Sequence, residues 1–514
     1  MYNYSKNYIK IYFWKIISIV SGFLSLLIVV PHLSNDKELY GIYTFCISFT
    51  LYLSYADIGF LSAGQKYASE AFAKGNRKDE VDILGFTGAI LLLMIAPFSI
   101  AMIYISYHPD VILNNLSVEA GNIASKIFLI LGIVLPFQII IQRLVQSILI
   151  IRIKDYISLR IDVLFNLIKI GSVFYFFSND NYLIVEYYLF ITLMMILSSI
   201  IILGIIQKSE SYNFLNLLKA IRFSKKQYDI TKKLAYSSFF LTIGWLVYYE
   251  LDLIFIGKWL GPKEVAIYAI GFTFLNFLRT LWNSVFGPFA QRFNHFVGLD
   301  AKDELKSLLR NIIDYTFPLS VITTLILVLS SELITVFWVG NEYLASVNIM
   351  QALIVGTVFL FISSPASYYF NAATRYSYIY LFAIVLPLVF LISNLILTPT
   401  FGLFGIAVSK SLAMLVCFII SVIGLFEVFN PLRLIKKWIF NLVILCSFLI
   451  YVFPVVLENI FINQVKSSKN LLILIFISGS IIIISYILIL LTKQEQRRDL
   501  RIVWLKLIKK IVWK

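Results

Sequence analysis

Residues 470–492 read NLLILIFISGSIIIISYILILLT, a run without a charged side chain. A helix needs about 20 apolar residues to cross a hydrocarbon core of about 30 Å, and this run has the required length. It is continuously apolar and does not alternate between polar and apolar positions, so it does not suit a strand of a membrane β-barrel. The run predicts one membrane-spanning helix.

Similar apolar runs, bounded by charged residues, Pro, Asn or Gly, recur along the whole chain. They predict about fourteen membrane spans. The spans lie near residues 11–31, 40–61, 82–107, 123–150, 157–177, 183–206, 235–257, 265–289, 311–337, 346–370, 378–398, 402–426, 438–458 and 470–492. The expected fold class is therefore an all-α integral membrane protein.

The composition of the 514 residues excludes a soluble enzyme. Hydrophobic residues make up 60% of the chain, charged residues 14%, and the mean hydropathy is +0.88. A soluble domain carries about 25% charged residues, which it needs to cover its surface. The formal charge of +15 does not indicate nucleic-acid binding, because long apolar runs separate the basic residues and leave no basic domain. The lipid bilayer is the expected partner.

The basic residues are divided unevenly between alternate loops. One set of loops, which includes both termini, holds most of them, and the segment 207–233 is its longest member. The opposite set holds Lys37, Lys258, Lys263, Lys466 and Lys469. Loops rich in Lys and Arg remain in the cytoplasm, so both termini are predicted to be cytoplasmic. The basic, apolar tail 493–514 predicts an amphipathic helix on the anionic leaflet.

The three cysteines, Cys46, Cys417 and Cys446, lie inside apolar runs. They show neither CxxC spacing nor a Cys/His pattern. We therefore expect neither a disulfide framework nor a metal site.

Short sequence matches between distant segments indicate that the chain contains two related halves. At nearly constant offset, Tyr43 matches Tyr268, residues 78–80 (KDE) match 302–304 (KDE), and residues 154–156 (KDY) resemble 375–377 (RYS). Both halves begin with a span that leaves the cytoplasm, which predicts parallel repeats. The expected domains are six-helix bundles at 1–206 and 234–426, a basic cytoplasmic linker at 207–233, two further transmembrane helices at 427–492, and the tail 493–514.

The N-terminal region carries a recognisable pattern. Residues 31–43 read PHLSNDKELYGIY, and DIGF at 57–60 and YASE at 67–70 follow. This pattern resembles the signature of Wzx-type O-antigen and polysaccharide flippases. These proteins belong to the multidrug/oligosaccharidyl-lipid/polysaccharide exporter superfamily, together with the MATE extruders and the lipid II flippases. The layout of two bundles and a terminal hairpin extends the resemblance over the whole chain.

The resemblance implies a flippase and not an enzyme. The implied substrate is an undecaprenyl-diphosphate-linked oligosaccharide, moved across the bacterial cytoplasmic membrane by alternating access of the two halves. A glycan polymerase and a chain-length regulator are the further partners that it implies. No cofactor is implied, and H⁺ or Na⁺ are the candidate coupling ions.

Four basic residues remain inside the predicted spans, namely Lys126, Lys169, Arg279 and Lys410. An ionisable residue within a membrane is by default a functional candidate. Arg279 lies about 21 Å into its span at 1.5 Å per residue, and it shares a helix face with Asn276 and Asn283. A guanidinium grips phosphate bidentately, which suits a diphosphate. The alternative role of Arg279 is an ion pair that joins helices.

Lys169 and Lys410 extend the predicted basic cavity, and Lys126 is expected to be an interface anchor. Lys169 lies near mid-membrane in the fifth span. Lys410 lies nearer the outer end of the twelfth, and the alternative is that its long side chain reaches out to the interface.

In the fourth span Gln138, Gln142 and Gln146 form one polar stripe, with Arg143 beside them. A sugar-filled cavity would use this stripe. Hydrogen bonding between helices is the alternative.

Three acidic residues are candidates for coupling or gating. Glu250 and Asp252 lie in the seventh span, and carboxyls that alternate between protonated and ionised states couple ion gradients to conformational change. Their alternative role is to neutralise Arg279 or Lys410. The two point about 200° apart around the helix, so at most one faces a given cavity. Asp57 belongs to the flippase-like pattern and is predicted to be a gate or helix-end contact.

Two other functions compete with the flippase. A cation-coupled multidrug exporter would favour an acidic, aromatic cavity, whereas the deepest charges here, Lys169 and Arg279, are basic. A polytopic glycan polymerase or ligase would need a sizeable external loop. The longest predicted external loop spans only about 107–122 and carries no cluster of acids with basic residues and His.

Overall fold

The structure is a computed structural model. It describes residues 4–493 except 55–58, 179–181, 211, 299–300, 374 and 462–464, and at some helical positions it describes the backbone alone. These residues form sixteen α-helices and two short 3-10 helices, and no strand occurs among them. Contacts divide the chain into two compact units, residues 1–269 and 270–514.

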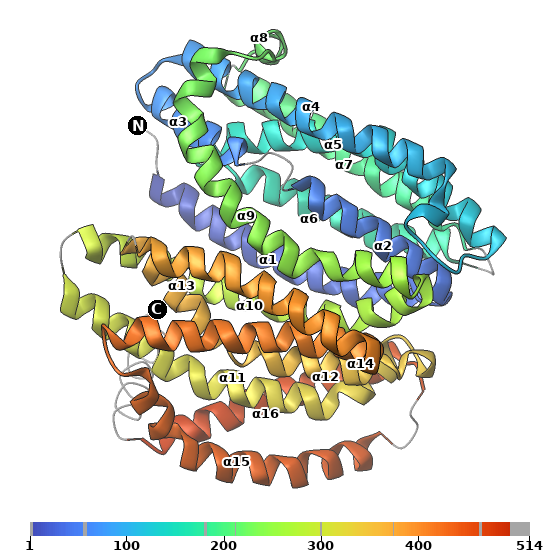
Figure 1. The fold of residues 1–514 in the computed structure, drawn as a ribbon, viewed down its shortest axis with the longest axis vertical. Coiled ribbons are helices and arrows are strands. Elements are labelled where there is room, and N and C mark those ends of the chain that lie inside the picture. The colour runs from blue at the N-terminus through green and yellow to red at the C-terminus, as the bar shows by residue number, and fades with distance from the viewer. Residues whose placement is uncertain are drawn as a thin grey trace, which may run out of the picture. The chain divides into compact units, whose positions relative to one another are not determined.

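Unit 1 is a bundle of long helices (Figure 1). It contains α1 (Tyr4–Leu33), α2 (Lys37–Ser54), α3 (Phe60–Ala73), α4 (Arg77–Tyr107), η1 (Pro109–Val111), α5 (Val118–Ile151), α6 (Tyr156–Phe176), α7 (Ile184–Glu210), α8 (Phe214–Ala220), α9 (Lys225–Trp259) and the first turns of α10 (Pro262–Gly298). Helix α5 packs against α4 and α7, and α1 packs against α6. Helix α9 packs against α2 and α3.

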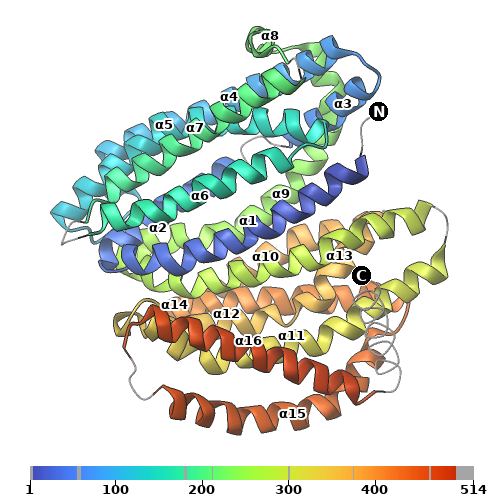
Figure 2. The ribbon, with the colours of Figure 1, turned by 180° about the vertical axis from the view of Figure 1, so that it is seen from behind.

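Unit 2 contains the rest of α10 and a second set of helices (Figure 2). These are α11 (Lys302–Trp338), η2 (Asn341–Tyr343), α12 (Ser346–Thr357), α13 (Leu360–Ala372), α14 (Tyr376–Phe426), α15 (Pro431–Ile460) and α16 (Ser468–Leu491). Helix α14 packs against α12 and α13, and both α15 and α16 pack against α11. The two terminal helices are thus part of unit 2.

The all-α prediction is confirmed, and helices occupy every predicted span within the described residues. Nine described helices are long and apolar enough to cross a membrane, or ten if α12 and α13, which are bent by 47° at their junction, form one span. The predicted spans 378–398 and 402–426 both lie in α14, whose helical backbone breaks at a kink at Gly402 (φ 55°, ψ −134°). Glycine reaches this conformation without steric cost.

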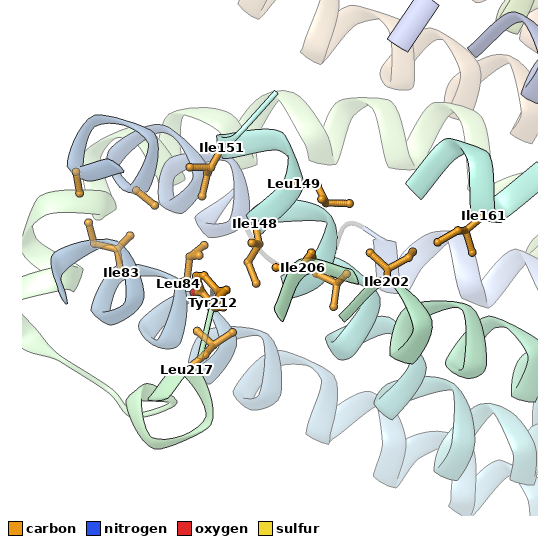
Figure 3. Close-up of a cluster of buried hydrophobic side chains, with 13 residues drawn as sticks. Ile83, Leu84, Ile148, Leu149, Ile151, Ile161, Ile202, Ile206, Tyr212 and Leu217 are labelled. Atoms are coloured by element: carbon orange, nitrogen blue, oxygen red, sulfur yellow. The ribbon is translucent and has the colours of Figure 1, made fainter. Parts of the chain in front are cut away.

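The first unit has a buried apolar cluster at one end of its helices. Ile83 and Leu84 of α4, Ile148 of α5 and Ile206 of α7 meet Leu217 of α8 there (Figure 3). Tyr212, which precedes α8, is part of the same cluster. The segment predicted as a basic linker therefore contains a helix that is packed into the bundle.

Polar contacts join helix ends that are predicted to lie on the same side of the membrane. At one end of unit 1, Glu80 at the start of α4 pairs with Arg152 after α5. At the other end, Glu38 of α2 pairs with Lys263 of α10 at 3.7 Å, and its carboxylate accepts a hydrogen bond from the Ser117 amide. Loops predicted to share a side thus meet within the unit.

Gly41, within the PHLSNDKELYGIY pattern, allows α2 to approach the start of α10. A Cβ atom at this position would lie 1.7 Å from the carbonyl oxygen of Pro262. A larger residue would force the two backbones apart, so this glycine is required by packing.

Candidate substrate and coupling sites

Lys410 is fully buried within unit 2, on the second half of α14. Its ammonium lies 4.4 Å from the ring centre of Phe272 and 5.6 Å from that of Phe390. Aromatic faces attract a cation, and more strongly when water is excluded. The side chain therefore points into the unit and does not reach out to an interface.

Arg279 lies on α10, also in unit 2, and is half-buried. Asn283, one turn later, is exposed, and the hydroxyl of Thr280 donates to the backbone carbonyl of Asn276. The side-chain oxygen of Asn276 is buried without a hydrogen-bond partner among the described residues. The predicted polar face therefore runs from a buried amide to an exposed one, with the guanidinium between them.

Lys169 and Arg143 are the basic candidates of unit 1, on α6 and α5 respectively. Both side chains are half-buried. Neither forms an ion pair or a side-chain hydrogen bond within the described part of the chain. A cation inside a bilayer is costly. Because neither basic residue has a described acidic partner, each is a candidate for binding an anion.

The glutamine stripe of α5 is bonded within itself. Gln138 donates to Gln142 across one helical turn, 2.5 Å from nitrogen to oxygen. Gln138 is buried, whereas Gln142 and Gln146 are half-buried. The amides of Gln142 and Gln146 are thus the more accessible ones of the stripe.

Asp252 of α9 is fully buried in unit 1 and receives a hydrogen bond from Tyr268. The hydroxyl of Tyr268, on the first turns of α10, lies 2.6 Å from the Asp252 carboxylate, and the tyrosine is itself fully buried. A buried carboxylate without a hydrogen-bond partner is costly, so this contact stabilises the buried position of Asp252. The contact between Tyr268 and Asp252 was not predicted from sequence. Tyr268 was identified there only as the counterpart of Tyr43 in the second half of the chain.

Two predicted residues cannot be placed. Glu250 lies in α9, but its side chain is outside the described residues, and Asp57 belongs to the undescribed segment 55–58. The tail 494–514 is likewise outside the described part.

A buried ion network in unit 1 was not predicted from sequence. The guanidinium of Arg152 lies 2.7 Å from Glu80 and 3.7 Å from Glu210, and Lys154 also pairs with Glu210. Arg77 lies 3.3 Å from Glu80. Arg152 is 2% exposed, although its place in a basic loop had suggested only a role in topology. The network connects the ends of α4, α5 and α7.

Unit 2 contains a smaller polar contact that anchors its terminal hairpin. Asp314 of α11 accepts hydrogen bonds from Lys437 at 2.9 Å and from the indole of Trp438 at 2.7 Å, both on α15. Asp314 and Trp438 are buried. Because Asp314 lies near a predicted span end, sequence alone did not distinguish it from an interface residue.

Comparison with solved structures identifies transporters with a similar fold. The lipid II flippase MurJ, in its inward closed conformation, superposes with a TM-score of 0.69 at 18% identity, covering 94% of this chain and 97% of MurJ. The fold is that of the MATE-like transporters. An inward-facing multidrug resistance MATE family transporter of the MOP superfamily gives a TM-score of 0.65 at 12% identity, covering 81% of this chain and 96% of that one.

Further comparisons agree with this fold. A eukaryotic MATE transporter gives a TM-score of 0.57 at 14% identity, covering 84% of this chain and 98% of that one. Residues 238–400 match the MatE family. Sequence comparison with curated proteins gives no match. The MATE-like fold thus rests on structural similarity along the chain and on a family match over part of it.

Proposed function

We propose that the protein is a flippase that moves an undecaprenyl-diphosphate-linked oligosaccharide, such as an O-antigen repeat unit, across the bacterial cytoplasmic membrane. The observation that carries this proposal is Lys169, a half-buried lysine in a predicted span without an ion pair or side-chain hydrogen bond in the described structure. The cost of a cation in a bilayer favours an anionic ligand at this position. A diphosphate attached to a lipid is a suitable anion.

Other basic groups support the same ligand. In unit 1, Arg143, like Lys169, forms no ion pair or side-chain hydrogen bond in the described structure. In unit 2, Arg279 of α10 is half-buried. Gln142 and Gln146 are half-buried and Asn283 is exposed, and we propose that their amides bind sugar hydroxyl groups. MurJ, described as a lipid II flippase, has the same fold. We propose alternating access driven by H⁺ or Na⁺, with Asp252 as the coupling carboxylate.

The test is a deletion strain complemented with Lys169→Met or Arg279→Ala. Each variant should insert normally, reduce surface glycan by about tenfold or more, and cause lipid-linked repeat units to accumulate, since a charge-assisted contact of about 1.5–3 kcal/mol is lost. Lys126→Met is the matched control because Lys126 is an exposed lysine on α5. A normal amount of surface glycan in both variants would show that the proposal of an anionic ligand at these residues is wrong.

A cation-coupled multidrug exporter is the second candidate, favoured by the MatE match over residues 238–400. An exporter of cationic drugs gains nothing from unpaired lysine and arginine at its binding site. Deletion should then sensitise cells to cationic drugs and leave surface glycan intact. The flippase predicts the reverse pattern, so the two readouts distinguish the functions.

A further inference from the structure

Helix α8 and the turn that follows it expose apolar side chains at the edge of unit 1. Leu215 is 66% exposed, Leu218 is 47% exposed and Phe223 is 63% exposed. These residues belong to the connection between α7 and α9, outside the predicted spans. A water-facing connection has no evident use for three large apolar side chains so close together.

The opposite side of this segment is fixed to α4. Leu217 is fully buried, and the carbonyl oxygen of Ala220 lies so close to Gly85 that a Cβ there would be 2.3 Å away. Ile221 approaches Gly88 in the same way, at 3.5 Å. The figures show α8 beside α4 from both sides (Figures 1 and 2). The exposed face is therefore held in a defined orientation.

The contact with α4 also fixes the depth of the segment. Gly85 and Gly88 lie three and six residues inside the predicted span 82–107, which corresponds to about 5–9 Å at 1.5 Å per residue. From the predicted span 82–107, we therefore expect the exposed leucines to lie at the level where hydrocarbon gives way to headgroups. Amphipathic helices with apolar and basic residues occupy this level.

Basic residues surround the exposed apolar ones. Lys219, Arg222, Lys225 and Lys226 are all exposed, and residues 212–226 contain no Asp or Glu. Lys226 pairs with Asp79 at 3.7 Å, and the acids Glu210 and Asp229 flank the segment on either side. Lys219 follows Leu215 one turn later on the same face of α8, and Arg222 lies two residues beyond the end of this helix. The surface therefore matches an anionic lipid layer both in charge and in polarity.

We propose that residues 214–226 form a binding surface for the anionic lipid headgroups of the surrounding bilayer. Leu215, Leu218 and Phe223 enter the boundary between headgroups and acyl chains, and Lys219 and Arg222 bind the phosphate groups. Because α8 is fixed to α4, this surface fixes the depth of the connection between α7 and α9. The proposal is independent of the transported substrate.

The test uses the full chain in lipid nanodiscs. The three cysteines, which are unpaired, are replaced by alanine, and an environment-sensitive fluorophore is attached at Leu218→Cys. Asn216→Cys is the matched control because Asn216 is also exposed on α8 but points about 200° away from Leu218. Quenching by lipids that carry a shallow spin label is compared between phosphatidylcholine and equal parts of phosphatidylcholine and phosphatidylglycerol.

The probe at position 218 should be quenched several-fold more than the probe at 216, and more strongly in the anionic mixture. Lys219→Glu with Arg222→Glu should weaken the preference for anionic lipid by about fivefold per charge. If the alanine background does not fold, hydrogen exchange of the backbone amides 214–223 in the natural chain should slow in the anionic mixture. Equal quenching at both positions, or exchange that ignores lipid charge, would overturn the proposal and favour a protein-docking face.

Discussion

The guanidinium of Arg152 lies 2.7 Å from the carboxylate of Glu80, and both side chains are fully buried. The two residues are 72 positions apart in sequence, and their contact connects the end of α5 to the start of α4. Removing one partner of a buried ion pair is costly because the remaining charge stays desolvated.

We therefore expect Arg152→Met to lower the free energy of unfolding by about 3–5 kcal/mol. Glu80→Gln should cost less, because Gln retains a hydrogen-bonding group and leaves Arg152 next to Glu210. The measurement is thermal unfolding in detergent for the single variants and the double variant. Lys66→Ala, in the exposed pair with Glu70, is the control and should change little. An Arg152 variant as stable as this control would contradict the interpretation.

Lys410→Met should separate stability from function. Lys410 is buried between Phe272 and Phe390, and methionine has a similar length without the desolvation cost of a charge. We expect the variant to fold and to lose transport in proteoliposomes. Lys410→Arg, which keeps the charge, should retain more transport than Lys410→Met. Full transport by the methionine variant would assign this lysine a packing role only.

Tyr268→Phe should alter ion coupling through Asp252. The variant removes the hydroxyl that donates to the carboxylate at 2.6 Å but keeps the ring. Loss of this donor leaves the buried carboxylate with one hydrogen bond fewer, so gradient-driven transport should slow. Asp252→Asn should abolish the dependence on the gradient, and Glu250→Gln tests the other acid of α9. Unchanged gradient-driven transport in Tyr268→Phe would remove Tyr268 from the coupling role.

Asp314→Asn should loosen the terminal hairpin. The substitution weakens the contacts with Lys437 and Trp438, each of which contributes about 1–3 kcal/mol as a charge-assisted hydrogen bond. Hydrogen exchange at the start of α15 should accelerate, whereas exchange in α5 of unit 1 should not change. Lys436→Ala alters an exposed neighbour of Lys437 and provides the control. The same acceleration in the control would show that Asp314 is not the anchor.

The helices could be predicted from sequence because each apolar run is local and its length matches the bilayer. The breaks could not be predicted equally well. The predicted spans 378–398 and 402–426 do meet at the break of α14 at Gly402, but nothing in the apolar pattern shows that the predicted span 40–61 contains the end of α2 at Ser54 and the start of α3 at Phe60. The candidate cations Lys169, Arg279 and Lys410 could be identified because charge is rare in such runs.

The sequence by itself determined the class of fold, the alternation of basic and non-basic loops, and the few charged residues inside the spans. Each of these follows from the polarity of a short stretch of sequence, which decides whether that stretch can lie in the bilayer. The tertiary structure alone decided which charges are compensated. Arg152, in a basic loop, is buried in an ion network, Lys410 lies over two aromatic rings, and Lys169 has no described partner. Whether a charge is paired depends on helices distant in sequence, and no local pattern contains that information.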